Sequence, residues 1–242
     1  MTAAALEAPD VETSSEAYAR RFVGPAGAFL LARQLALVEA LLADKVGATI
    51  LDVGGGHAQL SGPLAAAGHR VTVLGSTPGC AARLHRDPRN GAVRFVAAPL
   101  TRLPFGTASF DTVVAIRLMA HIDDWRQLVA EMSRVAQQTV LIDYPTWTSS
   151  NALSLLTFGV KKRIEGDTRR YRSFWGREIA QEFQRHGKHV VAERRQFLLP
   201  MALHRRMGGR RAFQRIEAMA AQGGLTALLG NPALLRADTA SG

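Results

Sequence analysis

The chain has 242 residues, of which 47% are hydrophobic and 21% charged, a composition typical of a globular domain. A single cysteine excludes a module built on intrachain disulfides, and no apolar run is long enough to cross a bilayer. The net charge of +10 lies in the last third, because residues 1–160 carry 13 basic and 13 acidic side chains and residues 161–242 carry 17 and 7.

This basic third is typical either of a surface that attracts anionic substrates, lipid headgroups or nucleic acid, or of an ordinary solvated face. The first residues are acidic and lack the basic and then apolar pattern of a secretion signal. We therefore expect a cytoplasmic protein without a transmembrane segment, and contact with a membrane surface stays open.

From residue 48 onward, short apolar runs alternate with helical patterns, which predicts a doubly wound α/β fold with helices on both faces of the sheet. Seven strands are expected, most of them parallel, with the last one at an edge of the sheet. Their predicted ranges are 48–53, 70–74, 92–96, 110–116, 139–143, 189–197 and 233–237.

Helical patterns precede the first strand and connect the later ones. The predicted helices cover residues 14–22, 27–43, 124–136, 177–185 and 202–221. The last of them forms a helical insertion before the final strand. No second hydrophobic core is apparent, so residues 1–242 predict a single domain. It divides into an N-terminal helical cap over 1–45, a core over 46–145 and an acceptor-side third over 146–242.

A glycine-rich turn follows the first predicted strand. Gly54, Gly55 and Gly56 leave the main chain free of side chains where the strand ends, so a ligand can approach the peptide atoms closely. In doubly wound sheets such turns lie at the ligand-binding edge. The following residues fit neither of the two glycine patterns that cradle nucleotide phosphates, because Gln59 occupies a glycine position and no lysine follows.

Four segments resemble, in order and spacing, the motifs of class I S-adenosylmethionine (SAM)-dependent methyltransferases. They are Asp-x-Gly-x-Gly-x-Ala at 52–58, Leu-Pro-Phe with Phe-Asp-x-Val at 103–113, Leu-x-x-His-x-x-Asp-Trp at 118–125 and Glu-x-x-Arg-Val at 131–135. The resemblance covers about residues 48–143 and is to the small-molecule branch that includes quinone-biosynthesis enzymes. It implies a Rossmann-like methyltransferase sheet, with SAM as cofactor and S-adenosylhomocysteine (SAH) as product.

The resemblance also implies donor-binding residues. Asp52 and the main chain of residues 54–56 would hold the methionine end of SAM. The alternative is that Asp52 only fixes the turn by accepting main-chain hydrogen bonds.

The sequence departs from the family at two positions that contact the donor. Gly75 stands where an acidic residue usually binds the ribose hydroxyls, and Pro99 stands where an Asp often contacts the adenine. Ser76, His57 or water would then meet the ribose, and the main chain at Leu100 would meet the adenine. These departures also allow a modified donor, or a fold that has lost catalysis.

Three titratable side chains are expected at the catalytic edge, because parallel strands end there together. His121 follows the fourth strand, and Asp143 and Tyr144 follow the fifth. His121 is either a general base or a structural residue bonded to a main-chain carbonyl. Tyr144 either orients the acceptor or forms a wall. Arg117 ends the fourth strand beside the expected donor, although a cation there suits an acidic acceptor better.

The acceptor side is predicted from basic and aromatic residues. Arg169, Arg170 and Tyr171 would clamp a carboxylate or phosphate, or else lie in solvent. The helix at 202–221 is either a lid with an apolar lining and a cationic rim, or plain packing on the sheet. The N-terminal helices either close the donor site or simply cap the domain. The histidines and the cysteine show no zinc spacing, so no metal is expected.

Together these features predict SAM-dependent methyl transfer to oxygen or carbon of a small, lipophilic or acidic metabolite. Nucleic acid is a disfavoured substrate, because residues 143–146 read Asp-Tyr-Pro-Thr and not the Asp-Pro-Pro-Tyr of amino-methylating nucleic-acid enzymes. The alternative is a noncatalytic or RNA-associated module that keeps the fold and binds through its basic third.

Overall fold

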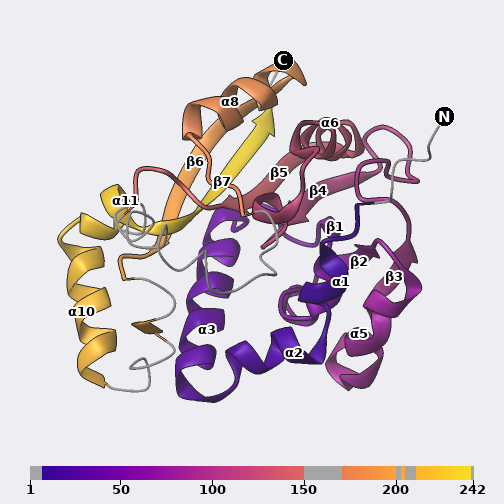
Figure 1. Cartoon of the computed structure of the whole chain (residues 1–242). Coiled ribbons are helices and arrows are strands. Elements are labelled where there is room, and N and C mark those ends of the chain that lie inside the picture. Colours follow the sequence, from indigo (N-terminus) through magenta and orange to yellow (C-terminus); the bar gives the residue numbers. More distant parts are fainter. Residues whose placement is uncertain (1–6, 150–170, 200–202, 205–210, 241–242) are drawn as a thin grey trace, which may run out of the picture.

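The computed structural model describes residues 7–149, 171–199, 203–204 and 211–240 (Figure 1). Within them, seven strands form one sheet in the order β3-β2-β1-β4-β5-β7-β6. The strands are β1 (Thr49–Val53), β2 (Arg70–Gly75), β3 (Arg94–Ala97), β4 (Phe110–Ala115), β5 (Ala136–Tyr144), β6 (Lys188–Phe197) and β7 (Asn231–Thr239). The first five are parallel and β7 is antiparallel to both of its neighbours. The predicted doubly wound, mostly parallel sheet is confirmed.

Helices cover both faces of this sheet. The α-helices are α1 (Asp10–Thr13), α2 (Glu16–Ala19), α3 (Gly24–Leu41), α4 (Ser61–Ala66), α5 (Ala82–Arg86), α6 (Trp125–Val135), α8 (Gly176–Arg185), α10 (Arg211–Gln222) and α11 (Leu225–Leu229). Side chains alternate along β1, so Ile50 packs in one apolar layer with Leu64 of α4, and Leu51 packs in the other with Leu128 of α6 and Phe183 of α8. Helices α10 and α11 precede β7 and form the predicted insertion (Figure 1).

The N-terminal helices differ from the prediction of one helix over 14–22. The Ser15 hydroxyl accepts a hydrogen bond from the Tyr18 amide at 3.1 Å, so it caps a new helix, α2. The chain before Ser15 forms the separate helix α1, and a 3-10 turn, η1 (Arg20–Phe22), follows α2. An N-terminal cap made of several short helices results.

Helix α3 is the longest described helix, and it buries Leu30, Gln34 and Val38. It is bent by 91° from the segment Glu16–Phe22 before it. No single helix among the described residues is long and apolar enough to cross a membrane, and this bent pair passes that test only when its two parts are taken together.

The prediction that the last strand lies at a sheet edge is wrong. Strand β7 pairs with β5 on one side and with β6 on the other, so β6 forms the edge. Its residues Leu234, Leu235 and Ala237 are all buried, because an interior strand packs on both faces. The start of β7 therefore lies beside the C-terminal ends of β5 and β6, where the cavity described next is found.

Candidate active site

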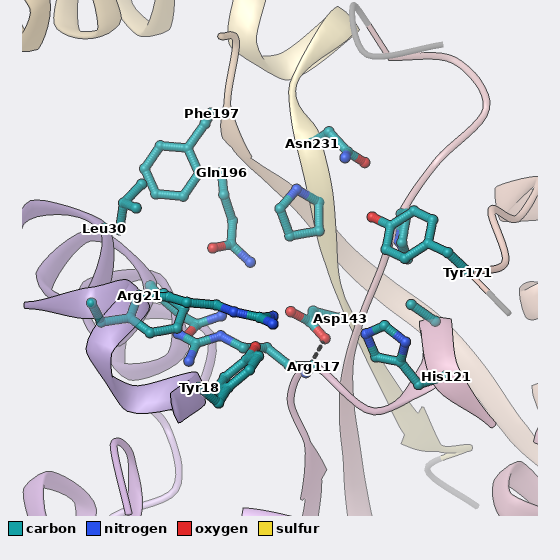
Figure 2. A pocket seen from close by; sticks show the side chains of 15 residues that line it. Tyr18, Arg21, Leu30, Arg117, His121, Asp143, Tyr171, Gln196, Phe197 and Asn231 are labelled. Carbon is teal, nitrogen blue, oxygen red and sulfur yellow. Dashed lines mark hydrogen bonds between the residues drawn. The ribbon is translucent and has the colours of Figure 1, made fainter. Parts of the chain in front are cut away.

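A cavity of about 320 Å³ lies at the C-terminal ends of β4 and β5 (Figure 2). Its walls come from α2, η1 and α3, from the segments after β4 and β5, and from the adjoining ends of β6 and β7. Apolar walls include Phe22, Leu30 and Phe197. The titratable side chains that line it are Tyr18, Arg21, Arg117, His121, Asp143 and Tyr171. This mixture suits a small molecule with an apolar body and charged or hydroxyl groups.

Arg117 and Asp143 are joined at one side of the cavity. The Asp143 carboxylate accepts a hydrogen bond from the Arg117 amide at 2.6 Å (Figure 2, dashed line). This bond helps to hold Arg117 at a φ of 62°, in the left-handed region. Asp143 is only 4% exposed, and burial raises its pKa to about 6, although the Arg117 amide and cation act in the opposite direction. Asp143 is therefore a more basic carboxylate than one on the surface.

The Arg117 guanidinium lies inside the protein. It donates hydrogen bonds to the side-chain oxygens of Gln34 and Gln59 and lies over the Phe22 ring, 4.3 Å from the ring centroid. Burial lowers the pKa of Arg117, but a guanidinium remains protonated at neutral pH. These amide partners are neutral, as is the Tyr18 hydroxyl that also bonds the guanidinium, so within the described part of the chain only the Asp143 carboxylate offsets the charge that an anionic ligand would meet. Sequence reasoning identified Arg117 but gave no sign of the two glutamines, which come from distant elements.

His121 and Tyr171 form a wall of the cavity across from Arg21 and Leu30 (Figure 2). Their ring centroids are 5.7 Å apart, with the planes inclined at 64°. The amide of Arg172 bonds the carbonyl of Ala120 at 2.9 Å and so fixes Tyr171 beside His121. The structure brings both predicted residues to one cavity with Asp143. Arg169 and Arg170 lie outside the described residues.

Tyr144 is placed elsewhere. Its side chain is 1% exposed and does not line the cavity. The hydroxyl donates a hydrogen bond to Glu193 Oε2 at 3.0 Å, and the ring lies 6.2 Å from that of Phe174. Burial raises the pKa of Tyr144. Successive side chains of a strand point to opposite faces, so Tyr144 faces away from the side that Asp143 occupies. This placement contradicts the prediction that Tyr144 shares the crevice.

The glycine turn after β1 is closely packed. Gly54 has a φ of 74°, which favours glycine. A Cβ on Gly55 would lie 2.2 Å from Asp52 Oδ2, and a Cβ on Gly56 would lie 2.3 Å from the Ser14 hydroxyl, so neither position accepts a side chain. Asp52 is fully buried, and burial raises its pKa to about 7. A cationic group close to Asp52 would therefore stabilise its ionised form.

His57, at the end of the turn, is also buried. Burial and the positive charge of Arg117 lower its pKa to about 3, so it is neutral at neutral pH. Its Nδ1 atom accepts a hydrogen bond from the Gln59 amide at 3.2 Å. This bond fixes the turn and leaves Nδ1 engaged.

Close packing at the end of β2 explains why position 75 holds glycine and not the family's acidic residue. A Cβ on Gly75 would lie 2.7 Å from Cys80 Cβ and 2.9 Å from the Phe95 ring, so no side chain fits there. The Ser76 amide instead donates a hydrogen bond to a carboxylate from far away in the sequence, Asp10 Oδ2, at 2.7 Å. Sequence reasoning missed Asp10, because nothing in the local pattern links it to the sheet.

The predicted adenine-binding positions follow β3. The side chain of Leu100 is buried in the apolar layer, so a ligand there would meet only its main chain. The Pro99 carbonyl accepts a hydrogen bond from the Arg102 amide at 3.2 Å. No carboxylate occupies either position, as the sequence shows.

Comparison with known proteins bears on this arrangement. Residues 51–142 match the family model of a methyltransferase domain. The O-methyltransferase rstn1 of Aspergillus nomiae is 34% identical over 95 residues, which are 37% of this chain and 42% of that protein. The chain therefore matches less than half the length of this curated relative. Over residues 51–142 the chain is similar to a methyltransferase domain, in agreement with the family that its motifs predict.

Solved methyltransferases share its fold. Magnesium protoporphyrin IX methyltransferase from Synechocystis, with bound SAH, superposes with a TM-score of 0.66 at 14% identity, covering 92% of this chain and 93% of that one. A SAM-dependent methyltransferase of Thermotoga maritima gives a TM-score of 0.62 at 14% identity, covering 93% and 95%. The predicted family and fold class are confirmed.

The turn of this methyltransferase domain fits the polar groups of SAM. Within the described residues, both carboxylate oxygens of Asp52 and the hydroxyls of Ser14 and Ser76 are buried without a hydrogen-bond partner. A carboxylate suits the ammonium group of SAM, and hydroxyls suit its polar atoms. However, helix α1 lies over the turn and over the Ser76 amide.

The structure describes part of the basic third, residues 161–242. Arg195 donates to the carbonyls of Thr148 and Leu228 and pairs with Glu193, so it has a structural role. The basic residues at 161–163 and 205–206 lie outside the described residues.

Among the residues that the structure does describe, no group of three His, Cys, Asp or Glu side chains gathers as a metal site would require.

Proposed function

We propose that this methyltransferase domain transfers the methyl group of SAM to an oxygen or carbon atom of a small acidic acceptor held in the cavity. The observation that carries the acceptor class is the buried guanidinium of Arg117, whose amide partners are neutral. Within the described residues no carboxylate forms an ion pair with this guanidinium, although the Asp143 carboxylate acts on it at longer range, and a buried cation without an ion pair favours a bound anion. The family match supports SAM as the donor.

Most residues that line the cavity would bind and orient the acceptor. Arg117 and Arg21 bind the anionic group of the acceptor, and Phe22 and Phe197 pack against its apolar body. SAM, when bound, supplies an electrophilic methyl group. The chain's main contribution is to orient the acceptor atom, which converts a bimolecular reaction into an effectively unimolecular one.

A hydroxyl acceptor must lose a proton as it is methylated. His121 lines the cavity and a neutral imidazole nitrogen can accept a proton, so we assign it as the base. Asp143 lines the same cavity, and its ionised carboxylate would stabilise the imidazolium that forms. An acceptor that already carries an ionised oxygen needs no such base.

The test uses radiolabelled SAM and a panel of hydroxybenzoates, with their neutral methyl esters as matched acceptors. Arg117→Gln should raise KM for the carboxylates at least about tenfold, the loss expected for a charge-assisted hydrogen bond, and change KM for the esters much less. Arg126→Gln is the control, because Arg126 stacks on Trp125 outside the cavity. An equal effect on acids and esters would refute the acceptor class.

The rival function is a noncatalytic module that binds RNA through the basic third. Two features favour this rival function because they oppose donor binding. Asp10 and Ser14 pack over the glycine turn, and a glycine stands at position 75 in place of an acidic residue. RNA binding that weakens steeply with salt, together with no binding of SAM or SAH, would establish the rival.

A further inference from the structure

Helix α1 fills the space over the glycine turn. Asp10 is 0% exposed, and its Cβ lies 3.7 Å from the position that a Cβ on Gly54 would take. The Ser14 hydroxyl lies 2.3 Å from the corresponding position on Gly56. Two side chains of the N-terminal segment therefore lie against the first and third glycines, on the peptide atoms that the family resemblance assigns to SAM.

The same segment blocks the end of β2. The Ser76 amide, which follows Gly75, already donates to Asp10 Oδ2 at 2.7 Å. An amide N–H donates one good hydrogen bond, so a donor molecule cannot use this amide while Asp10 does. The cavity at the ends of β4 and β5 is lined by neither Asp10 nor the three glycines, so it does not provide an alternative route onto the turn.

We propose that α1 is an autoinhibitory segment, which occupies the donor position and must leave the glycine turn before SAM binds. This inference rests on the proposed function, since it concerns regulation of the same site. In the closed state Asp10 replaces the donor at the Ser76 amide, and Ser14 covers the turn at Gly56. In the open state both positions become available to SAM.

The contacts of α1 suit a segment that opens. It has four residues, and a helix so short is not stable on its own. Away from the turn, Glu12 pairs with Arg21, whose side chains are 41% and 49% exposed, and exposed pairs contribute little. The Glu7 carboxylate, just before α1, accepts hydrogen bonds from the exposed amides of Asp123 and Asp124. The bond from the Ser76 amide to Asp10 is buried and charge-assisted, so it contributes more to the closed position than an exposed pair does.

The closed state also leaves buried polar atoms of the described residues without hydrogen bonds. Asp10 Oδ1 and the hydroxyls of Ser14 and Ser76 are buried without a hydrogen-bond partner within the described part of the chain. Buried polar atoms without partners oppose a conformation. SAM would replace α1 with a ligand that has hydroxyl, amino and carboxylate groups to offer at the turn. Exchange of α1 for the donor is therefore favoured at this position.

The decisive experiment is calorimetric titration of SAH into the full chain and two variants. Asp10→Ala removes the bond to Ser76 and should bind SAH about tenfold more tightly, because apparent affinity rises with the fraction of open molecules. Glu12→Ala is the matched control on the same helix, since Glu12 forms an exposed ion pair with Arg21. It should leave SAH affinity within about twofold.

Hydrogen exchange supplies a second measurement. In the closed state the amides of Ser14 and Ser15 donate to the carbonyls of Asp10 and Glu12, both at 2.9 Å. Saturating SAH should open α1 and speed exchange at these two amides. If α1 instead closed over the bound donor, the same amides would exchange more slowly, which would overturn the proposal.

The outcomes separate this inference from the proposed function. If the unmodified chain binds SAH and Asp10→Ala binds it equally or more weakly, autoinhibition is refuted and methyl transfer stands. If only Asp10→Ala binds SAH, both are supported. If neither binds SAH at millimolar concentration, the proposed function fails, and autoinhibition fails with it. Should Asp10→Ala not fold, Asp10→Asn keeps the size and one acceptor oxygen, and its affinity should rise by a smaller factor.

Discussion

Substitution of Asp52 by Asn should make the stability of the protein much less dependent on pH. Burial raises the pKa of Asp52 to about 7 in the folded chain, from 3.8 in an unfolded one. The folded state therefore holds the proton more tightly. Below pH about 4 both states are protonated, and Asp52 costs no stability. Between pH about 4 and about 7 the unfolded chain releases its proton first, so the free energy of unfolding falls as pH rises.

The size of this loss of stability follows from the difference between the pKa of Asp52 in the folded and the unfolded chain. About three pH units at 1.36 kcal/mol each give a loss of about 4 kcal/mol once the pH exceeds about 7. Asp143, whose pKa is raised to about 6, adds a loss of the same sign that Asp52→Asn leaves in place. The variant should consequently gain about 4 kcal/mol relative to the unmodified chain between pH 4 and pH 8.

Urea denaturation followed by circular dichroism at pH 4, 6 and 8 measures this difference. Asp111→Asn is a control of opposite sign, because hydrogen bonds from Thr49 lower the pKa of Asp111, and its contribution is lost as pH falls. Curves for Asp52→Asn and the unmodified chain that stay parallel from pH 4 to 8 would refute the assignment of a buried carboxyl at the turn.

Two further substitutions test the packing around the site. Gly75→Asp would restore the family's carboxylate, yet it should destabilise the protein by about 1–3 kcal/mol and not improve SAH affinity, because Cys80 and Phe95 leave no room; tighter SAH binding in a calorimetric titration would contradict this. Tyr144→Phe should lose about 1 kcal/mol in urea denaturation through the missing bond to Glu193 and keep kcat and KM, whereas a large fall in kcat would return Tyr144 to the catalytic residues.

The parts of the fold that depend on local pattern could be predicted from the sequence. The helix predicted over 124–136 is found at Trp125–Val135, because its apolar residues recur at helical spacing. The glycine turn was found for a similar reason, since glycines between a strand and a helix mark a close approach of the main chain.

Features set by contacts distant in sequence could not be predicted. The place of β7 depends on which strand pairs with the free side of β5, and local pattern does not contain that choice. The cavity brings together Gln34, Gln196 and Asn231, which are far apart in the sequence. The hydrogen bond from the Ser76 amide to Asp10 joins residues that are 66 positions apart in the sequence. The prediction for Tyr144 was wrong because the sequence places it at the end of a strand but does not show which face of the sheet its side chain occupies.

A crystal structure of the full chain grown with saturating SAH would examine the glycine turn directly. We expect SAH against Gly54 and Gly56, with α1 withdrawn and the Ser76 amide released from Asp10. SAH bound elsewhere, with the bond between Asp10 and Ser76 intact, would contradict the assignment of this turn as the donor site.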